Sequence, residues 1–191
     1  MEETNRVIAV VYYSGYGHTA RLAEAVREGG NALDGVEARL YDITRLDDDS
    51  WAELDAAAAL VFGAPTYMGS AAAKFKAFME DTSKRWFSRA WKDKLAAGFT
   101  CSASQSGDKL NTLVQLVTLA SQHGMLWVGL DILGGNNSSK GSPDDLNRLG
   151  CYLGVMAQAN ADQGAEVMRE SDFATARRLG ERMAEQLLRL R

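Results

Sequence analysis

The chain has 191 residues, of which 46% are hydrophobic and 24% charged, and its formal net charge is −4. This length and composition predict one globular domain over residues 1–191 with a substantial core. The basic residues form only short clusters, which argues against nucleic-acid binding, because phosphate contacts need a concentrated cationic face. Two cysteines and an acidic, polar start predict a reducing, cytoplasmic setting.

Strand and helix signals alternate along the chain. Residues 6–14 form a β-branched and aromatic run, typical of a strand buried on both faces, and helical spacing follows over 19–29. The alternation predicts an α/β fold with a doubly wound parallel sheet and helices on both faces. Further strands are predicted at 36–43, 56–69, 95–103 and 125–133, helices at 71–82, 110–121, 173–191 and within 144–158, and a helical turn at 50–54 capped by Ser50.

Residues 110–130 carry no charge, which raises the question of a membrane span. Polar residues interrupt this stretch, and its helical period breaks near Gly124. We therefore expect a helix, a turn and a buried strand, and no membrane insertion.

The stretch "YYSGYGHTAR" at 12–21 lies between the first strand and the first helix. The free N–H groups and the dipole at a helix start favour an anion there, and Ser14 and Thr19 add hydroxyl donors. No lysine follows the glycines, so this stretch is not a triphosphate-binding loop. It also lacks the G-x-G-x-x-G pattern of a dinucleotide-binding fingerprint. Oriented N–H and O–H donors alone hold a monophosphate, and a plain structural turn is the alternative.

Other loops join this one in a consistent pattern. "YYSGYGHT", "FGAPTYMG", Trp86, "KLAAGF" and "QHGM" occur in order over residues 5–130. Together they resemble the flavodoxin-like NAD(P)H:quinone oxidoreductases typified by the tryptophan-repressor-binding protein (WrbA) family. The resemblance implies a flavodoxin-like doubly wound sheet of five parallel strands that binds FMN across the carboxyl ends of its strands.

The resemblance also assigns residues to the cofactor. The first loop would hold the phosphate and the ribityl chain, whereas the second and third loops would approach the isoalloxazine ring. The implied FMN-binding residues are Ser14, Gly15, Tyr16, Gly17, His18 and Thr19 in the first loop, Pro65, Thr66, Tyr67 and Met68 in the second, and Cys101, Ser102, Ala103, Ser104, Gln105 and Ser106 in the third.

Two features depart from the family pattern. The third loop reads "CSASQSGDK", where relatives have a Thr/Gly-rich stretch, which leaves its individual contacts open. Tyr67 stands where some relatives have arginine, which removes a cationic contact. Cys101 is expected to be an inert, buried thiol rather than a redox-active one.

Three further residues have implied roles at the reaction centre. His123 matches a family histidine near the flavin, sometimes supplied across a subunit interface, and would be catalytic; its alternative role is to end the preceding helix. Trp86 would wall a substrate cleft for a planar quinone, and Tyr16 would contact the nicotinamide nucleotide.

The resemblance thus implies an FMN-dependent NAD(P)H:quinone oxidoreductase. Two electrons would pass by hydride transfer from NADH or NADPH through FMN to a quinone, with one cleft serving both substrates in ping-pong order. Relatives also imply a homo-oligomer, a dimer or tetramer. One alternative is a flavodoxin-type electron carrier without a substrate of its own, although carriers tend to be far more acidic. The other is an interaction protein that has lost the flavin.

Overall fold

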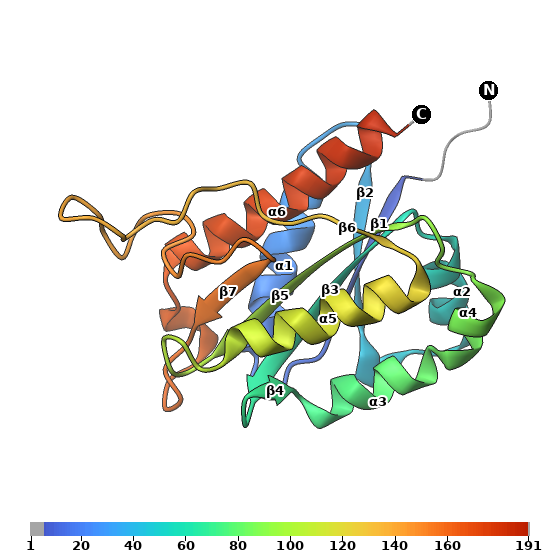
Figure 1. The fold of residues 1–191 in the computed structure, drawn as a ribbon, viewed down its shortest axis with the longest axis horizontal. Helices are drawn as coiled ribbons and strands as arrows, with labels where there is room; N and C mark the ends of the chain where they lie inside the picture. Colours follow the sequence, from blue (N-terminus) through green and yellow to red (C-terminus); the bar gives the residue numbers. More distant parts are fainter. Residues whose placement is uncertain (1–5, 191) are drawn as a thin grey trace.

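The structure, a computed structural model, describes residues 6–190 and is built around one parallel sheet (Figure 1). Strands β1 (Val7–Tyr12), β2 (Glu37–Asp42), β3 (Ala59–Tyr67) and β5 (Leu95–Ser102) lie in the order β2-β1-β3-β5. The fifth position is shared by β6 (Leu126–Trp127) and β7 (Val155–Gln158), which both pair with β5. The winding direction reverses between β1 and β3, which confirms the predicted doubly wound sheet and locates its switch point.

Helices cover both faces of the sheet, and each face has its own apolar core (Figure 1). On one face lie α1 (His18–Gly30) and α6 (Glu170–Arg189), which approach so closely that a Cβ on Gly180 would lie 2.0 Å from the Val26 carbonyl oxygen. The opposite face is covered by α2 (Asp48–Ala56), α3 (Ala73–Asp81) and α5 (Lys109–His123). The remaining elements are short: helix α4 (Ser83–Ser88), strand β4 (Ser70–Ala71), and the 3-10 turns η1 (Ile43–Arg45) and η2 (Ala165–Val167).

The fifth strand differs from the sequence prediction. Only Leu126 and Trp127 of the predicted strand 125–133 pair with β5, and the chain then leaves the sheet. Asp131 explains the departure, because its carboxylate forms ion pairs of 2.6 Å with Arg178 and 3.0 Å with Arg182, both on α6. The predicted helix within 144–158 is also wrong: its last residues form β7, whose alternate residues are buried.

The segment 128–154 between β6 and β7 loops away from the sheet edge (Figure 1) and is fastened to α6 by buried polar contacts. Asn147 donates its side-chain amide to the Ile132 carbonyl (3.0 Å), while its backbone N–H donates to the Thr175 hydroxyl (2.9 Å). Arg148 forms two 2.8 Å hydrogen bonds with Asp172, and both side chains are almost fully buried. These contacts set the position of β7 beside β5.

The start of α2 also differs from the prediction. Asp47, rather than Ser50, is the N-cap residue, and its carboxylate accepts hydrogen bonds from the Ser50 backbone N–H (2.9 Å) and hydroxyl (2.6 Å). A carboxylate is the stronger acceptor at a helix N-terminus, where the dipole favours negative charge. No helix within residues 6–190 combines the length and apolar character needed to cross a bilayer.

Candidate functional site

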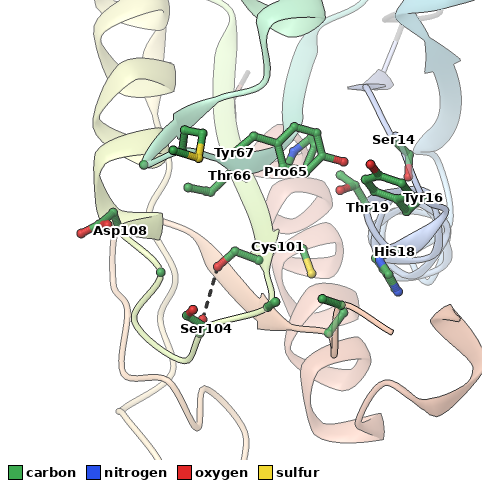
Figure 2. A pocket seen from close by; sticks show the side chains of 17 residues that line it. Ser14, Tyr16, His18, Thr19, Pro65, Thr66, Tyr67, Cys101, Ser104 and Asp108 are labelled. Carbon is green, nitrogen blue, oxygen red and sulfur yellow. Dashed lines mark hydrogen bonds between the residues drawn. The ribbon is translucent and has the colours of Figure 1, made fainter. Parts of the chain in front are cut away.

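Three loops converge at the carboxyl ends of β1, β3 and β5 and enclose a cleft of about 630 Å³ (Figure 2). Parallel strands deliver these loops to one edge of the sheet, beside the switch point, where ligands of doubly wound folds bind. The structure brings most of the predicted cofactor residues into this cleft: Ser14, Tyr16, His18, Thr19, Pro65, Thr66, Tyr67, Met68, Cys101, Ser102, Ala103 and Ser104.

The first loop presents hydrogen-bond donors without a cation. Gly17 occupies the N-cap position of α1 with φ +91° and supplies no capping side chain, so the first-turn N–H groups are left for a ligand. The Ser14 hydroxyl accepts a 3.0 Å hydrogen bond from the Gly17 N–H, and buried Thr19 lines the cleft. With no lysine or arginine among the lining residues, this end suits an anion held by oriented dipoles.

The second loop is a rigid hairpin turn. Tyr67 pairs with Ser70, so Met68 and Gly69 form a two-residue turn, with φ +49° at Met68 and +77° at Gly69. Positive φ at both positions matches the strand twist of a hairpin, although it strains the non-glycine Met68. The Met68 side chain is fully exposed at the cleft rim.

Buried hydroxyls hold the base of this second loop. The Thr66 hydroxyl lies 2.7 Å from the hydroxyls of both Thr100 on β5 and Thr112 on α5. Because each hydroxyl both donates and accepts, the three form a satisfied chain that links the second loop to two other elements.

Two tyrosines border the mouth of the cleft. Tyr16 and Tyr67 pack edge to face with ring centroids 6.1 Å apart, and Tyr16 is 78% exposed. The Tyr67 hydroxyl lies close to Gly15, where an added Cβ would approach it to 2.5 Å and the Tyr67 side chain would have to shift. Partial burial raises the pKa of Tyr67, so its phenol stays protonated at neutral pH.

The third loop is only partly in the cleft. Ser102 and Ser104 line it, and the Ser102 hydroxyl donates a 3.3 Å hydrogen bond to the Ser104 carbonyl (Figure 2). Gln105 and Ser106, predicted as cofactor residues, line instead a neighbouring cavity of about 770 Å³ that also contacts Arg148. The loop turns away from the cleft at Gln105 and Ser106 and returns to it at Gly107 and Asp108 before α5 begins, and the sequence pattern does not reveal that turn.

Cys101 lines the cleft, but its thiol is unreactive. Its side chain is 3% exposed, and burial raises the pKa of its thiol to about 12. The protonated thiol is a poor nucleophile, in agreement with the inert, buried role expected from the sequence.

The structure adds lining residues that the sequence analysis missed: Gly69, Gly107, Asp108, Ala159 and Ala161. The two alanines follow β7, and the erroneous helix prediction over 144–158 hid the strand end that delivers them. The His18 ring nitrogen Nε2 lies 2.8 Å from the Gln163 carbonyl, so the first loop is tied to this same segment. Asp108 lies at the end of the cleft opposite Ser14 and Thr19 (Figure 2).

Trp86 and His123 do not line this cleft. They line a separate cavity of about 430 Å³, between α3, α4 and the end of α5. Helix α5 has 15 residues and begins at the cleft, so its rise carries His123 about 20 Å away, to the opposite edge of the sheet. Within one chain, therefore, neither residue reaches a ligand in the cleft.

His123 is neutral and buried, with an exposed fraction of 1%. The Thr82 hydroxyl donates to the Met79 carbonyl (2.7 Å), so it accepts at 2.9 Å from His123 Nε2–H. Nδ1 is then the unprotonated nitrogen, and it has no hydrogen-bond partner among residues 6–190. Burial, and secondarily the charge of Arg89, lowers the pKa of His123 to about 4.

Comparisons with known proteins agree on one fold family. The family model described as Flavodoxin matches residues 10–125. Flavodoxin FldP from Pseudomonas aeruginosa is 43% identical over 92% of this chain and 93% of its own. An NAD(P)H dehydrogenase (quinone) from Azorhizobium caulinodans is 32% identical over 96% of this chain and 98% of its own. The solved structure of a flavodoxin, WrbA-like protein from Agrobacterium tumefaciens is 43% identical, covers 97% of this chain and 99% of its own, and has a TM-score of 0.77.

The buried imidazole predicts a specific loss of stability in acid. Above pH 6.5 His123 is neutral in both the folded and the unfolded chain, so its contribution is fully present. As the pH falls from 6.5 toward 4, the unfolded chain gains a proton that the folded chain excludes. We expect this difference to cost about 2 kcal/mol of unfolding free energy between pH 7.5 and 5.0.

Urea unfolding of wild type and His123→Gln at both pH values measures this loss. Glutamine still donates to Thr82 but does not titrate, so the variant retains about 2 kcal/mol more of its pH 7.5 stability on acidification than the wild type does. His18→Gln removes the only other histidine and is the control. Equal losses in wild type and His123→Gln would show that His123 does not cause the acid sensitivity.

Proposed function

The chain belongs to the flavodoxin family, and from that premise we propose that it is an FMN-dependent NAD(P)H:quinone oxidoreductase. The relative from Azorhizobium caulinodans carries the name NAD(P)H dehydrogenase (quinone) and matches nearly the whole chain. The observation that carries the proposal is the cleft at the switch point. One end of it is an anion cradle, formed by the start of α1 with Ser14 and Thr19, and its opening is bordered by exposed aromatic and apolar side chains.

The residues of the cleft fit FMN. Its volume of about 630 Å³ lies within the range of roughly 300–1,000 Å³ that is usual for cofactor sites. The phosphate would meet the free N–H groups at the start of α1 and the hydroxyls of Ser14 and Thr19, a donor set that holds a dianion without a cation. The rest of the molecule would extend toward the second and third loops, where Pro65, Tyr67 and Ala103 add apolar surface.

When bound, FMN supplies the chemistry that takes two electrons from NAD(P)H and delivers them to a quinone. The chain contributes orientation and electrostatics. The Met68–Gly69 turn and the hydroxyl chain of Thr66, Thr100 and Thr112 hold the second loop rigid, so its backbone groups are preorganised toward the cleft. Exposed Tyr16 and Tyr67 offer edges and faces against which a planar nicotinamide or quinone ring packs.

If Trp86 and His123 act at the cleft, as the family resemblance implies, a second subunit must supply them, and a homo-oligomer is therefore part of the proposal. A second subunit could bring its cavity between α3, α4 and the end of α5 against the cleft of the first. The half-exposed Trp86 ring would then form a wall of the quinone site. The neutral His123 imidazole would lie behind it, too buried, at 1% exposure, to contact the quinone directly. Its low pKa argues for hydrogen bonding rather than proton donation at neutral pH.

A flavodoxin-type electron carrier is the second candidate function. It is favoured by Flavodoxin FldP, which is 43% identical over 92% of this chain. The fully exposed Met68 at the cleft rim also suits contact with a protein partner. Against it stands the modest net charge of −4, because carriers use strong acidity to steer toward their redox partners.

The two candidate functions differ in their response to nicotinamide nucleotides. For the enzyme, we expect purified, FMN-loaded protein to lose its yellow colour on addition of NADH or NADPH without air, and to regain it with benzoquinone. Absorbance at the flavin maximum measures both changes. A flavin that dithionite bleaches but neither nucleotide does would favour the carrier, and protein that takes up no FMN would contradict both.

The anion cradle predicts that Thr19→Val selectively loses affinity for FMN. The substitution keeps the shape of the side chain but removes a hydroxyl hydrogen bond to a charged group, which is worth about 1.5–3 kcal/mol, or roughly tenfold or more in affinity. Fluorescence titration should show weaker FMN binding and unchanged riboflavin binding, because riboflavin lacks the phosphate. Thr118→Val, on the exposed side of α5, is the matched control. Equal weakening for both ligands would place Thr19 away from the phosphate.

The oligomer proposal predicts a defect in Trp86→Ala. Loss of the aromatic wall should lower kcat/KM for benzoquinone roughly tenfold while FMN content stays unchanged. Phe87→Ala, at the neighbouring and more exposed position, is the matched control. Unchanged quinone kinetics in Trp86→Ala would make Trp86 a surface residue with no part in the site.

A further inference from the structure

Lys109 is a fully buried lysine directly behind the third loop of the cleft. Its side chain has no exposed surface, and it is the first residue of α5. Burial disfavours the charged ammonium, and the positive end of the helix dipole disfavours a cation at this position. Burial and the helix dipole thus both disfavour the ammonium of Lys109, and the apolar spacing of α5 does not require a lysine at this position.

The ammonium holds the wall of the cleft. Lys109 Nζ donates to the Ser102 hydroxyl (2.7 Å) and to the Ser104 carbonyl (2.6 Å), and both serines line the cleft. The wall is tightly packed, since a Cβ on Gly107 would lie 2.2 Å from the Ser102 hydroxyl oxygen. A single layer of loop therefore separates the charge of Lys109 from any ligand against Ser102 and Ser104.

The charge of Lys109 has no carboxylate partner. Its Nζ forms no ion pair within the described part of the chain. Asp172, the buried carboxylate that acts on it, is occupied by two hydrogen bonds from Arg148, and the Cys101 thiol is neutral. Burial lowers the pKa of Lys109 to about 8, so the ammonium stays protonated at pH 7.

The cleft has distinct ends, and Lys109 lies behind the one that does not hold the phosphate. The anion cradle is at the start of α1, whereas the second and third loops border the remaining space (Figure 2). Under the proposed function, that space holds the ring of FMN. Uptake of two electrons and one proton adds one negative charge to the ring, and a fixed cation behind the wall favours that form against the opposing effect of Asp108, which lines the same end of the cleft.

We propose that Lys109 is a positioning residue that orders the third loop through Ser102 and Ser104 and whose unpaired charge stabilises reduced FMN over oxidised FMN. The proposal rests on the FMN-binding part of the proposed function, but it requires neither NAD(P)H nor a quinone. In this proposal the hydrogen bonds of Lys109 order the third loop, whereas its charge shifts the equilibrium between oxidised and reduced FMN. Two substitutions of Lys109 can therefore separate the two effects.

The test compares wild type with Lys109→Gln and Lys109→Met in redox titrations against reference dyes, with dithionite as the reductant. Glutamine keeps a neutral donor for the serines, whereas methionine keeps only the length of the side chain. Lys94→Met is the matched control, because Lys94 is a partly buried lysine that also donates hydrogen bonds to the backbone, at the Leu54 and Asp55 carbonyls, and precedes β5 at the opposite edge of the sheet. Fluorescence titration gives the affinity for oxidised FMN in each protein.

We expect both Lys109 variants to bind reduced FMN about tenfold more weakly relative to oxidised FMN than the wild type does, a fall of about 30 mV for a two-electron couple. Lys94→Met should keep the wild-type ratio. Oxidised FMN should bind Lys109→Gln within about threefold of the wild-type affinity, and Lys109→Met more weakly, because its loop loses two hydrogen bonds.

An unchanged ratio in Lys109→Gln would overturn the proposal, as would failure of both Lys109 variants to fold or to bind oxidised FMN while Lys94→Met does both. If Lys109→Met alone fails to fold, Lys109→Gln still decides the role of the charge. A shifted ratio in a protein that reduces no quinone would uphold Lys109 and contradict only the enzyme. Wild-type protein that takes up no FMN would contradict both proposals.

Discussion

The parallel pairing of β1, β3 and β5 is the constraint on which the rest of the structure depends. Parallel neighbours need crossover helices, and those helices leave every carboxyl end at the same edge of the sheet. Three loops far apart in the sequence therefore meet around one cleft. The same constraint sends α5 back across the sheet and carries His123 to the opposite edge, away from the cleft of its own chain.

The divided fifth strand is the second determinant of the site. Because β6 ends after two residues and β7 resumes the pairing with β5, the segment 128–154 returns to the sheet beside the third loop. It brings Arg148, which engages the carboxylate of Asp172. Asp172, whose charge acts on Lys109, is thereby engaged by Arg148, so the excursion of the chain affects the electrostatic surroundings of Lys109.

The cleft combines neutral dipoles at one end, the Asp108 side chain at the other, and the buried cation of Lys109 behind the third loop. Hydroxyls and helix N–H groups form the anion cradle, and no lysine or arginine lines the surface. A ligand with a compact dianion at one end and an apolar ring at the other matches this arrangement. The exposed Tyr16, Tyr67 and Met68 then leave the ring end accessible, which suits an exchange of electrons with a second molecule.

The sequence by itself determined the alternating elements, the doubly wound sheet and the first two loops of the site. Apolar periodicity and turn chemistry act over short windows, so residues 6–19 and 56–69 predict their structure without distant contacts. Only the tertiary structure decided where the fifth strand breaks, since Asp131 leaves the sheet to meet arginines on α6. It alone also excluded Gln105 and Ser106 from the cleft, added Ala159 and Ala161, and buried Lys109 without a carboxylate. These features depend on contacts between residues distant along the chain, and no local pattern encodes such contacts.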